Sequence, residues 1–486
     1  MGDLPVGVGL TLDPALRRFR DGTVLAGGRP GRVMTLTREG VRSLAALVAG
    51  GPADSAARAL GGRLVAAGMA HPRRPGGRAS VEGAPGPGDV TVVVPAHDRT
   101  DALDRCLASL GRTVPVVVVD DASEDAGGVA DVCRRHAVRV VRRTLNGGPG
   151  AARGSADDSV TTDLVAYVDS DCTVPPDWLE GLLWHFADPE VAAVAPRLRP
   201  AAVPADRDRR ALHRFARSHS PLDLGPEEGE VGPGRAVRYV PTAALVVRRT
   251  ALGSVGGFDG TLRVGEDVDL VWRLVEAGWR VRYEPSVTVS HDEPDRWGDL
   301  LGRRLRYGTS AAPLAVRHPG RLAPVELRPP ATVAALALVA GHPVLAGAVV
   351  ASSALPLARE VRPLGIPPTE AWRWAGAAAG WTVMGVGRAA TMLALPALVG
   401  LAATGRQGRR AAVALVLVPP VVDWLRLRPD LDLPRWVAAS VADDVAYGAG
   451  VWTGSIRART TAALLPRLTR SGPPSRRPTL LKTDDG

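Results

Sequence analysis

Two aspartates separated by one residue form the sharpest chemical pattern in this sequence. Asp169 and Asp171 come directly after the apolar run Leu164–Val168. Hard divalent cations such as Mg²⁺ and Mn²⁺ prefer oxygen ligands, and a bound ion can neutralise charge on a departing diphosphate. Asp-x-Asp alone is a common pattern. Its position after a buried strand predicts a metal site that serves a phosphate-bearing substrate.

A second acidic pair, Asp120 and Asp121, follows the run Val116–Val119. A carboxylate at the end of a strand can accept a hydrogen bond from a base N–H or order a ribose. The alternative is that the pair caps the next helix.

Glu266 and Asp267 stand immediately before a helical pattern that includes Trp272 and Leu274. A carboxylate at a helix entry can remove the proton from an attacking hydroxyl. We predict that Asp267 is this base and that Glu266 supports it. The alternative is that both acids only complement the helix dipole.

His291 follows the stretch Ser286–Ser290, itself downstream of a predicted strand at Val281–Tyr283. A single histidine can be structural, or it can complete a metal shell. Both readings stay open.

The elements that must position these residues form an α/β pattern. Val90–Val94 and Val116–Val119 are continuous β-branched runs, typical of parallel strands buried on both faces. Arg99–Leu110 carries apolar residues on one helical face, which completes a right-handed βαβ unit. Ligands in such folds bind beyond the carboxyl ends of the strands. We therefore expect a Rossmann-like α/β domain.

A glycine-rich segment, Asn146–Gly154, opens another predicted helix. Its glycines let the backbone approach a ligand closely. Arg153 at its end could face a diphosphate or hold the base-binding carboxylates. It could also be an ordinary salt-bridging helix residue.

These motifs together resemble family 2 glycosyltransferases, which have the GT-A fold. The similar segments are Pro95–Arg99, Val119–Ser123, Asn146–Gly154, Asp169–Asp171 and Gly265–Leu270. The family usually has Tyr-Asn where His97 and Asp98 stand here. The resemblance implies an inverting enzyme whose UDP-sugar donor is bound by Pro95, Asp98, Asp120, Asp121, Arg153, Asp169 and Arg306. It also implies that Mg²⁺ or Mn²⁺ is bound by Asp169, Asp171 and His291.

Arg306 enters this set through the segment Arg303–Tyr307, which resembles the Gln-x-x-Arg-Trp motif of processive β-glycan synthases. Arg306 would contact the diphosphate, and Tyr307 would stack on an acceptor sugar. Arg303 and Tyr307 depart from the motif, and a basic surface helix is the alternative.

Residues 1–75 form a separate unit. Val6–Leu12 and Gly31–Leu36 are strand-like, Thr37 is a candidate N-cap, and a second helix is expected over Ala56–Ala67. This order resembles PqqD-like, winged-helix peptide-recognition domains. The alternative is a structural cap on the enzyme. Residues 76–89, rich in Pro, Gly and Arg, are predicted to be a linker that leads into a catalytic domain at 90–325.

Residues 326–460 are predicted to be a hydrophobic helical region. Pro330–Ala358 has no charged residue, and Ala375–Ala403 has only Arg388. Each run is also long enough to cross a bilayer. Trp436–Ser455 contains Asp443 and Asp444, which are costly in lipid. We predict two spans rather than four. Buried helices of a soluble domain, or a monotopic hairpin, are the alternatives.

The remaining composition narrows the class of protein. The net charge is +10, but Lys482 is the only lysine and the arginines are scattered, so we expect no nucleic-acid partner. Cys106, Cys133 and Cys172 form no metal or redox pair. No secretory signal pattern is present. We expect the cytoplasmic face of the cell membrane, or alternatively the cytoplasm, and a disordered basic tail over 461–486 that could touch lipid.

The order of the three regions resembles the mycofactocin-system glycosyltransferases. That resemblance implies transfer of glucose from UDP-glucose to a peptide-derived redox cofactor, building a β-1,4-linked oligoglucan. Residue spacing by itself shows neither the sugar nor the acceptor. A membrane polysaccharide synthase or lipid-linked sugar transferase is the first alternative. A non-enzymatic scaffold that recruits a peptide is the second.

Overall fold

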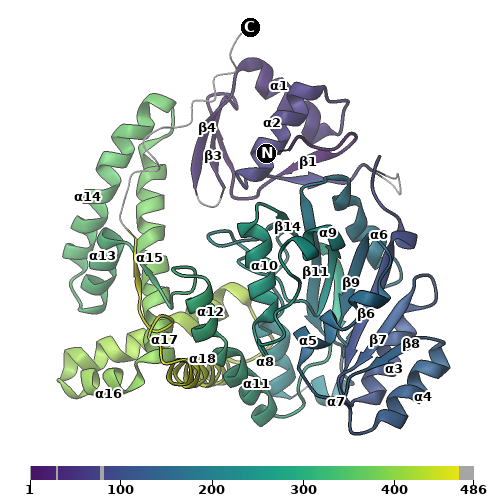
Figure 1. Ribbon diagram of the computed structural model, residues 1–486. Helices are drawn as coiled ribbons and strands as arrows, with labels where there is room; N and C mark the ends of the chain where they lie inside the picture. The colour runs from purple at the N-terminus through teal and green to yellow at the C-terminus, as the bar shows by residue number, and fades with distance from the viewer. Residues whose placement is uncertain (1, 29–30, 77–80, 209, 470–486) are drawn as a thin grey trace. The chain divides into compact units, whose positions relative to one another are not determined.

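The structure is a computed structural model that describes residues 2–28, 31–76, 81–208 and 210–469 (Figure 1). Within these residues the chain divides into two compact units. One unit contains residues 2–202 and 220–292, and the other contains residues 203–219 and 293–469.

The first unit is built on a nine-stranded mixed sheet in the order β10-β14-β11-β13-β9-β6-β7-β8, with β12 paired to β14. The four strands β9, β6, β7 and β8 are parallel, which confirms the parallel pair predicted at Val90–Val94 and Val116–Val119, whereas β13 runs antiparallel to both β9 and β11. The strands are β6 Val90–Ala96, β7 Val116–Asp120, β8 Arg139–Arg142, β9 Leu164–Val168, β10 Cys172–Thr173, β11 Val191–Pro200, β12 Gly229–Glu230, β13 Ala244–Arg248 and β14 Arg280–His291.

Helices cover this sheet because the strands are apolar on both faces. Val92, Val118 and Ala166 are completely buried, and Leu103 of α3 packs in the same core. The predicted helix over Arg99–Leu110 is confirmed as α3, Thr100–Leu110. The other helices of the sheet domain are α4 Ala126–His136, α5 Pro149–Gly154, α6 Trp178–Leu183, α9 Arg249–Ser254 and α10 Glu266–Glu276.

Strand β14 is longer than the sequence predicts. We expected a strand at Val281–Tyr283 and a separate stretch at Ser286–Ser290, but one strand runs through both and ends at His291. Its parallel pairing with β11 shifts register between Pro196 and Arg197. The irregularity lets a single strand pass a Pro-containing segment without leaving the sheet.

The N-terminal part of the first unit, residues 2–76, is here called the head. It contains the strand pair β1 Gly9–Leu12 and β5 Ala70–Arg73, and the sheet β2 Arg17–Phe19, β3 Val24–Gly27 and β4 Arg32–Thr35. Helices α1 Arg38–Ala49 and α2 Ser55–Ala66 pack on these strands. The Thr37 hydroxyl accepts a bond from Gly40 N at 3.0 Å, which confirms the predicted N-cap.

The head shares its hydrophobic core with the sheet domain. Trp184, from the 3₁₀ turn Trp184–Ala187, packs among head residues such as Leu4 and Leu64. Val81 joins the same core although it lies in the predicted linker, residues 76–89. The composition of a Pro- and Gly-rich segment does not show that one of its side chains is buried in a neighbouring core.

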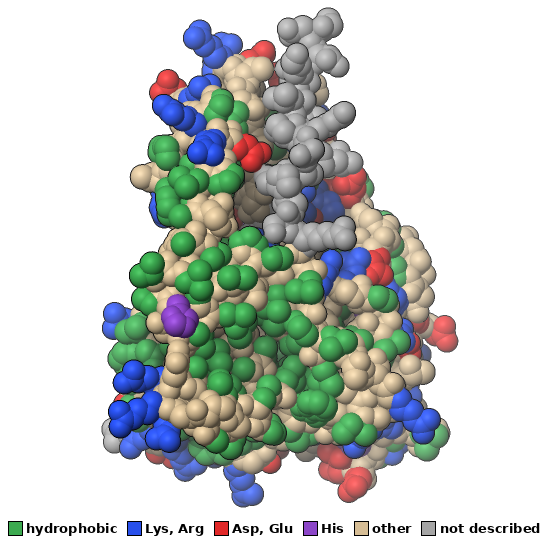
Figure 2. Space-filling view, turned by 90° about the vertical axis from the view of Figure 1, so that its left-hand side faces the viewer, with side chains coloured by type: hydrophobic (Ala, Val, Ile, Leu, Met, Phe, Trp, Pro, Cys, Tyr) green, Lys and Arg blue, Asp and Glu red, His purple; other side chains and the backbone are tan. Residues whose placement is uncertain are grey.

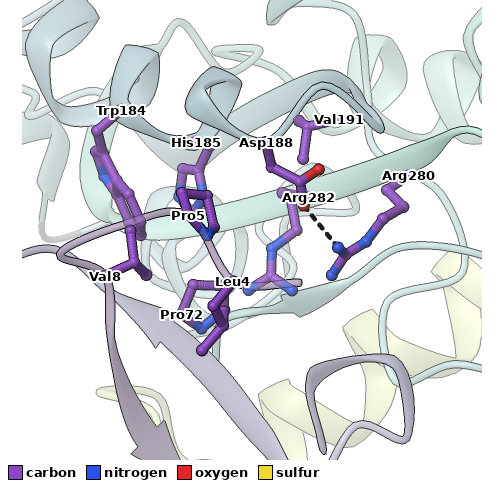
Figure 3. Close-up of a pocket in the computed structure, with 10 residues that line it drawn as sticks. All are labelled: Leu4, Pro5, Val8, Pro72, Trp184, His185, Asp188, Val191, Arg280 and Arg282. Atoms are coloured by element: carbon purple, nitrogen blue, oxygen red, sulfur yellow. Dashed lines mark hydrogen bonds and ion pairs between the residues drawn. The ribbon is translucent and has the colours of Figure 1, made fainter. Parts of the chain in front are cut away.

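A small recess lies at this junction and is drawn in Figure 3. It has room for about one water molecule, about 20 Å³, and is lined by head residues such as Pro72 and by Arg280 and Arg282 of β14. Arg280 Nη1 pairs with Asp188 at 2.6 Å, and the Glu284 carboxylate accepts from His185 Nε2 at 2.9 Å. The recess is at the opposite end of β14 from His291.

The second unit is helical. Its helices are α7 Ala205–Asp208, α8 Ala211–His219, α11 Trp297–Thr309, α12 Ala311–Arg317, α13 Pro329–Val339, α14 Pro343–Val361, α15 Pro368–Leu393, α16 Leu395–Ala403, α17 Arg406–Leu427 and α18 Leu433–Arg457. The short strands β15 Glu326–Leu327 and β16 Arg467–Leu468 pair in parallel. The predicted disordered tail therefore begins too early at 461, and its residues 470–486 lie outside the described residues.

The long apolar runs are broken. The run Pro330–Ala358 is two helices because Gly341 takes a positive φ of 77° and Pro343 starts α14. The run Ala375–Ala403 is bent by 103° between α15 and α16. Among the described helices, one is long and apolar enough to cross a membrane, or two if the bent pair counts as one span.

Candidate active site

The acidic residues singled out by the sequence lie after the ends of neighbouring strands. Asp120 ends β7, and Asp169 follows β9. The register pairs Ala96 of β6 with Asp120 across the sheet. Parallel strands bring their carboxyl ends to one edge, so Pro95, Asp98 and the two acidic pairs share that edge.

Arg153 is the central residue of the site. Its guanidinium is buried, with Nη1 2.9 Å from Glu266 Oε1 and Nη2 2.5 Å from Asp169 Oδ1. It also lies 5.5 Å from the centre of the Phe258 ring. Burial would lower the pKa of Arg153, but Asp169 and then Glu266 outweigh it and raise the pKa. The structure thus places Arg153 between Asp169, a predicted metal ligand, and Glu266, at the entry of α10. It does not place Arg153 against Asp120 or Asp121.

Asp120 and Asp121 are both buried, and both oxygens of each carboxylate interact with protein groups. Asp120 Oδ1 accepts from Ser123 N at 2.9 Å, and Oδ2 pairs with Arg142. Asp121 accepts from Gly147 N at 3.0 Å and Gly148 N at 2.7 Å. These bonds join the acidic pair to the glycine-rich segment that opens α5.

Two arginines on this edge were missed by the sequence reasoning. Arg142 ends β8 and pairs with Asp120, and Arg143 Nε lies 2.8 Å from Asp121 Oδ1. The signal was available in principle. Arg142 stands directly opposite Asp120 in the β7–β8 register, which a correct strand alignment would have given.

Asp98 holds the loop after β7 in place. Its Oδ1 accepts from Glu124 N at 2.8 Å and Asp125 N at 3.3 Å, and its own N–H donates to Ser123 Oγ at 2.8 Å. Asp98 and Arg99 both have positive φ, at 54° and 52°. This backbone turns the chain sharply between β6 and α3 and sends the Arg99 side chain toward Asp171.

Asp171 and His291 lie next to each other, with Asp171 Oδ1 3.5 Å from His291 Nε2. Cys172, the residue after Asp171, pairs with His291 across β10 and β14, which explains the approach. Arg99 Nη1 lies 2.7 Å from the other oxygen, Asp171 Oδ2. His291 Nδ1 is buried and has no hydrogen-bond partner.

These residues have the donor chemistry of a divalent-cation site: carboxylate oxygens and an imidazole nitrogen. Asp171 and His291 already face each other, whereas Asp169 is turned to Arg153. As the side chains stand, no group of three His, Cys, Asp or Glu residues in the described chain is close enough to hold an ion. An ion held by all three would therefore require Arg99 and Arg153 to release their carboxylates.

Asp267 is in the first turn of α10 beside Glu266. Loss of solvation and, second, the Glu266 carboxylate raise the pKa of Asp267 to about 7. A carboxylate with this pKa is well suited to take a proton near neutral pH. Burial also raises the pKa of Asp169, against the opposing effect of Arg153.

Asp269, which the sequence reasoning did not single out, fixes the loop before α10. It is completely buried and pairs with Arg273 Nε at 2.8 Å. Arg273 then donates to Val255 O at 2.5 Å and Gly257 O at 2.8 Å. A buried acid two residues after Asp267 therefore orders the Gly256–Gly257 loop through Arg273.

Arg306 is exposed on α11 of the second unit, while the other predicted site residues lie in the first. The structure does not place Arg306 relative to them, and its role stays a prediction. The assignment of residues 1–75 as a peptide-recognition domain also stays a prediction.

Residues 91–251 match the Glycosyl transferase family 2 profile. The chain is 38% identical to a pre-mycofactocin glycosyltransferase of Mycobacterium tuberculosis (strain ATCC 25618 / H37Rv) over 480 residues, covering 96% of this chain and 98% of that protein. The chain belongs to the pre-mycofactocin glycosyltransferase family. Its mixed sheet is the GT-A fold expected from the sequence, and it is a family 2 glycosyltransferase.

Two more distant similarities complete the comparison. An N-acetylglucosaminyl-diphospho-decaprenol L-rhamnosyltransferase of M. tuberculosis is 30% identical over 260 residues, covering 47% of this chain and 85% of that protein. A mannosyltransferase from Pyrobaculum calidifontis, solved with GDP-Man and Mn²⁺, is 22% identical with a TM-score of 0.37, covering 69% of this chain and 90% of that chain.

Proposed function

We propose that this glycosyltransferase moves glucose from UDP-glucose onto mycofactocin, a peptide-derived redox cofactor, or onto its precursor, and builds a β-1,4-linked oligoglucan. The donor and the linkage come from the family resemblance, and the acceptor is supported as well by the similarity to the pre-mycofactocin glycosyltransferase of M. tuberculosis. The observation that carries the chemistry is Asp267, whose pKa is about 7 at the entry of α10.

The reaction is a single displacement with inversion. The acceptor oxygen forms a bond to the anomeric carbon while the bond from that carbon to the diphosphate oxygen breaks. The proton of the acceptor hydroxyl passes to Asp267, and UDP leaves with the bonding electron pair. Glu266 is occupied by Arg153, so Asp267 is the acid left to act as base.

Asp169, Asp171 and His291 are the residues that would hold Mg²⁺ or Mn²⁺. When bound, the ion would supply positive charge that stabilises the departing diphosphate. The Asp120–Arg142 and Asp121–Arg143 pairs fix the shape of the edge where the nucleotide would bind. The head would recruit the peptide-derived acceptor, and the enzyme would work at the cytoplasmic face of the membrane.

The test measures UDP released from UDP-glucose with Mn²⁺ or Mg²⁺, with and without the peptide-derived acceptor. Asp267→Asn should lower acceptor-dependent release by about 1,000-fold, within the range for loss of a general base. Asp131→Asn is the matched control, since Asp131 lies on the exposed face of α4 and pairs only with Arg134 in the described structure. UDP release that ignores the acceptor or survives in Asp267→Asn would contradict the proposal.

A lipid-linked sugar acceptor is the second candidate. The N-acetylglucosaminyl-diphospho-decaprenol L-rhamnosyltransferase is 30% identical to this chain over 260 residues, and the C-terminal helices include apolar ones. The same assay with a polyprenyl-diphosphate sugar distinguishes the two. Sugar transferred only to the lipid would favour this second function.

A further inference from the structure

Helix α13 of the second unit has its small residues inside and its large apolar residues outside. Ala334, Ala335 and Ala337 are buried. Val333, Leu336 and Leu338 on the same helix are exposed to 47%, 55% and 47%. In water the hydrophobic effect favours the reverse arrangement, because larger apolar side chains gain more from burial.

Helix α14 repeats the arrangement. Ala346, Ala354 and Ala358 face inward, whereas Val344 is 86% exposed and Leu345 is 51% exposed. Figure 2 shows the resulting surface as a broad field of apolar side chains. Large exposed apolar patches mark interaction surfaces, and this one extends over several helices.

Glycines allow the helices of this unit to touch backbone to backbone. A Cβ added at Gly387 would lie 2.6 Å from Leu415 O, and one at Gly448 would lie 1.8 Å from Met392 O. Close packing on small residues is the rule for helices in lipid, where the solvent is as apolar as a leucine side chain. The inverted size pattern therefore points to a lipid environment for the outer face.

A basic cluster adjoins this face. Arg406, Arg409 and Arg410 at the start of α17 are exposed, and the described chain shows no ion pair for them. The sequence has no acidic residue between Glu370 and Asp423 that could balance them. Gln407 donates to Ala340 O, which places the start of α17 beside the turn between α13 and α14. Phosphates of anionic lipids fit such a cluster.

The helix lengths argue against a complete crossing. Helix α13 has 11 residues, about 16 Å, which is half of the roughly 30 Å hydrocarbon layer. It begins at the exposed Arg328 and packs beside α14 (Figure 1). If α14 crossed the bilayer, Arg328 would lie near the centre of the lipid, where a charge is costly. The bend between α15 and α16 likewise turns the chain back.

We propose that the α13–α14 turn and α16 insert into one leaflet of an anionic bilayer without crossing it, with Arg406, Arg409 and Arg410 at the start of α17 on the lipid phosphates. This monotopic docking replaces the two spans expected from the sequence. It is independent of the sugar chemistry, so the vesicle experiments below use no donor or acceptor and cannot be confused with failure of the transferase assay.

The first experiment is flotation of the full chain with vesicles of phosphatidylcholine alone or mixed with phosphatidylglycerol. Val344→Glu should weaken binding to the mixed vesicles at least tenfold, because a charge replaces the most exposed apolar side chain of the tip. Val6→Glu is the matched control, since Val6 is 53% exposed on the head. Equal binding by both variants, each shown to be folded by circular dichroism, would overturn the proposal.

The second experiment tests the basic cluster. Changing Arg406, Arg409 and Arg410 together to Gln should weaken binding to phosphatidylglycerol vesicles by about 100-fold and remove its salt sensitivity. Changing Arg17, Arg18 and Arg38, which are exposed on the head, should have little effect. If both triple variants bind alike, the cluster does not face the lipid and this part of the proposal is wrong.

The third experiment separates insertion into one leaflet from a span. Cys106, Cys133 and Cys172 are buried and unpaired, so a fluorescent probe can be placed on an introduced cysteine. With mid-bilayer nitroxide lipids, a probe on Val344→Cys at the tip of α14 should be quenched more than one on Ser352→Cys in its middle. A spanning helix would give the opposite order, and that result would overturn the proposal.

Discussion

The sheet domain and the C-terminal helices bury apolar side chains of different size. In the sheet, large β-branched residues such as Val92 and Val118 are completely buried. In α13 and α14 the buried positions are mostly alanines, and valines and leucines face outward. Both regions are apolar in composition, so hydropathy alone does not distinguish them. The two regions differ in the size of the residue at each buried position, which is the observation behind the proposed lipid contact of α13 and α14.

Charges show the same contrast. Four acids of the candidate site are each paired with an arginine: Asp120 with Arg142, Asp121 with Arg143, Asp169 with Arg153, and Asp171 with Arg99. Opposite charges that are removed from water stabilise each other, and an unpaired buried charge is very costly. The exposed arginines of α17 have no such partner in the described chain. The four acid–arginine pairs fix the geometry of the candidate site, whereas the exposed arginines of α17 are available to a partner.

The largest expected effect is on the paired interior. Arg153→Met should lower the free energy of unfolding by about 3–5 kcal/mol, because Asp169 and the buried Glu266 would lose their shared cation. Chemical denaturation measures this. Adding Glu266→Gln to Arg153→Met should restore part of the loss, whereas a double variant no more stable than the single one would show that the network is not held by charge.

The pH dependence of activity comes next. Asp267 must be ionised to act as base, so kcat/KM should fall tenfold for each pH unit below its pKa of about 7, about 100-fold by pH 5. Steady-state rates over pH 5–9 measure this. A profile without an inflection near 7 would exclude Asp267 as the base.

The same group has a stability consequence of known sign. Its pKa rises from 3.8 to about 7 on folding, so the folded state favours the protonated carboxyl. That stabilisation is complete below pH 3.8 and is lost as the pH rises through about 7. Relative to Asp267→Asn, the wild type should become less stable between pH 5 and pH 8.

The inverted helices provide a matched pair of adjacent residues. Ala354→Leu should destabilise the protein by about 1–3 kcal/mol, because Ala354 is completely buried and its surroundings are packed. Leu355→Ala, at a position 47% exposed, should change stability by less than about 0.5 kcal/mol. Thermal unfolding in a mild detergent measures both. The reverse order would mean that the helices pack with their large residues inward.

The smallest effect concerns helix caps. Thr37→Ala should cost about 1 kcal/mol, since its hydroxyl satisfies an N–H at the start of α1. Arg328→Ala at the start of α13 should have no capping cost, because Arg328 makes no side-chain cap bond. Equal losses at the two positions would remove this distinction between the head helix and the apolar one.

Local patterns predicted much of the fold. The β-branched runs predicted β6 and β7, and the apolar run before Asp169 marked β9, because strands buried on both faces need continuous apolar residues. The acids after these strands were found for the same reason. Arg142 and Arg143 were missed because their partners are set by the order and register of the sheet.

The break at 340–342 was missed for a different reason. Hydropathy is continuous through Pro330–Ala358, so only Gly341 and Pro343 indicated that the helix ends. Asp269 was missed because a buried acid on a helix face looks like any polar residue until its arginine partner is known. The geometry of the candidate site depends on which side chains pair across the chain, and the local sequence pattern does not show these pairs.

Trp184 lies outside the head in the sequence, yet its side chain is part of the hydrophobic core of the head. The two parts are therefore one folding unit, although composition separates them. A chain shortened to begin at Val90 would leave this indole in water and would lose the inner surface of the recess in Figure 3. Exchanging the head between relatives should succeed only when the residue at position 184 is exchanged with it, because the core of the head includes Trp184 of the sheet domain.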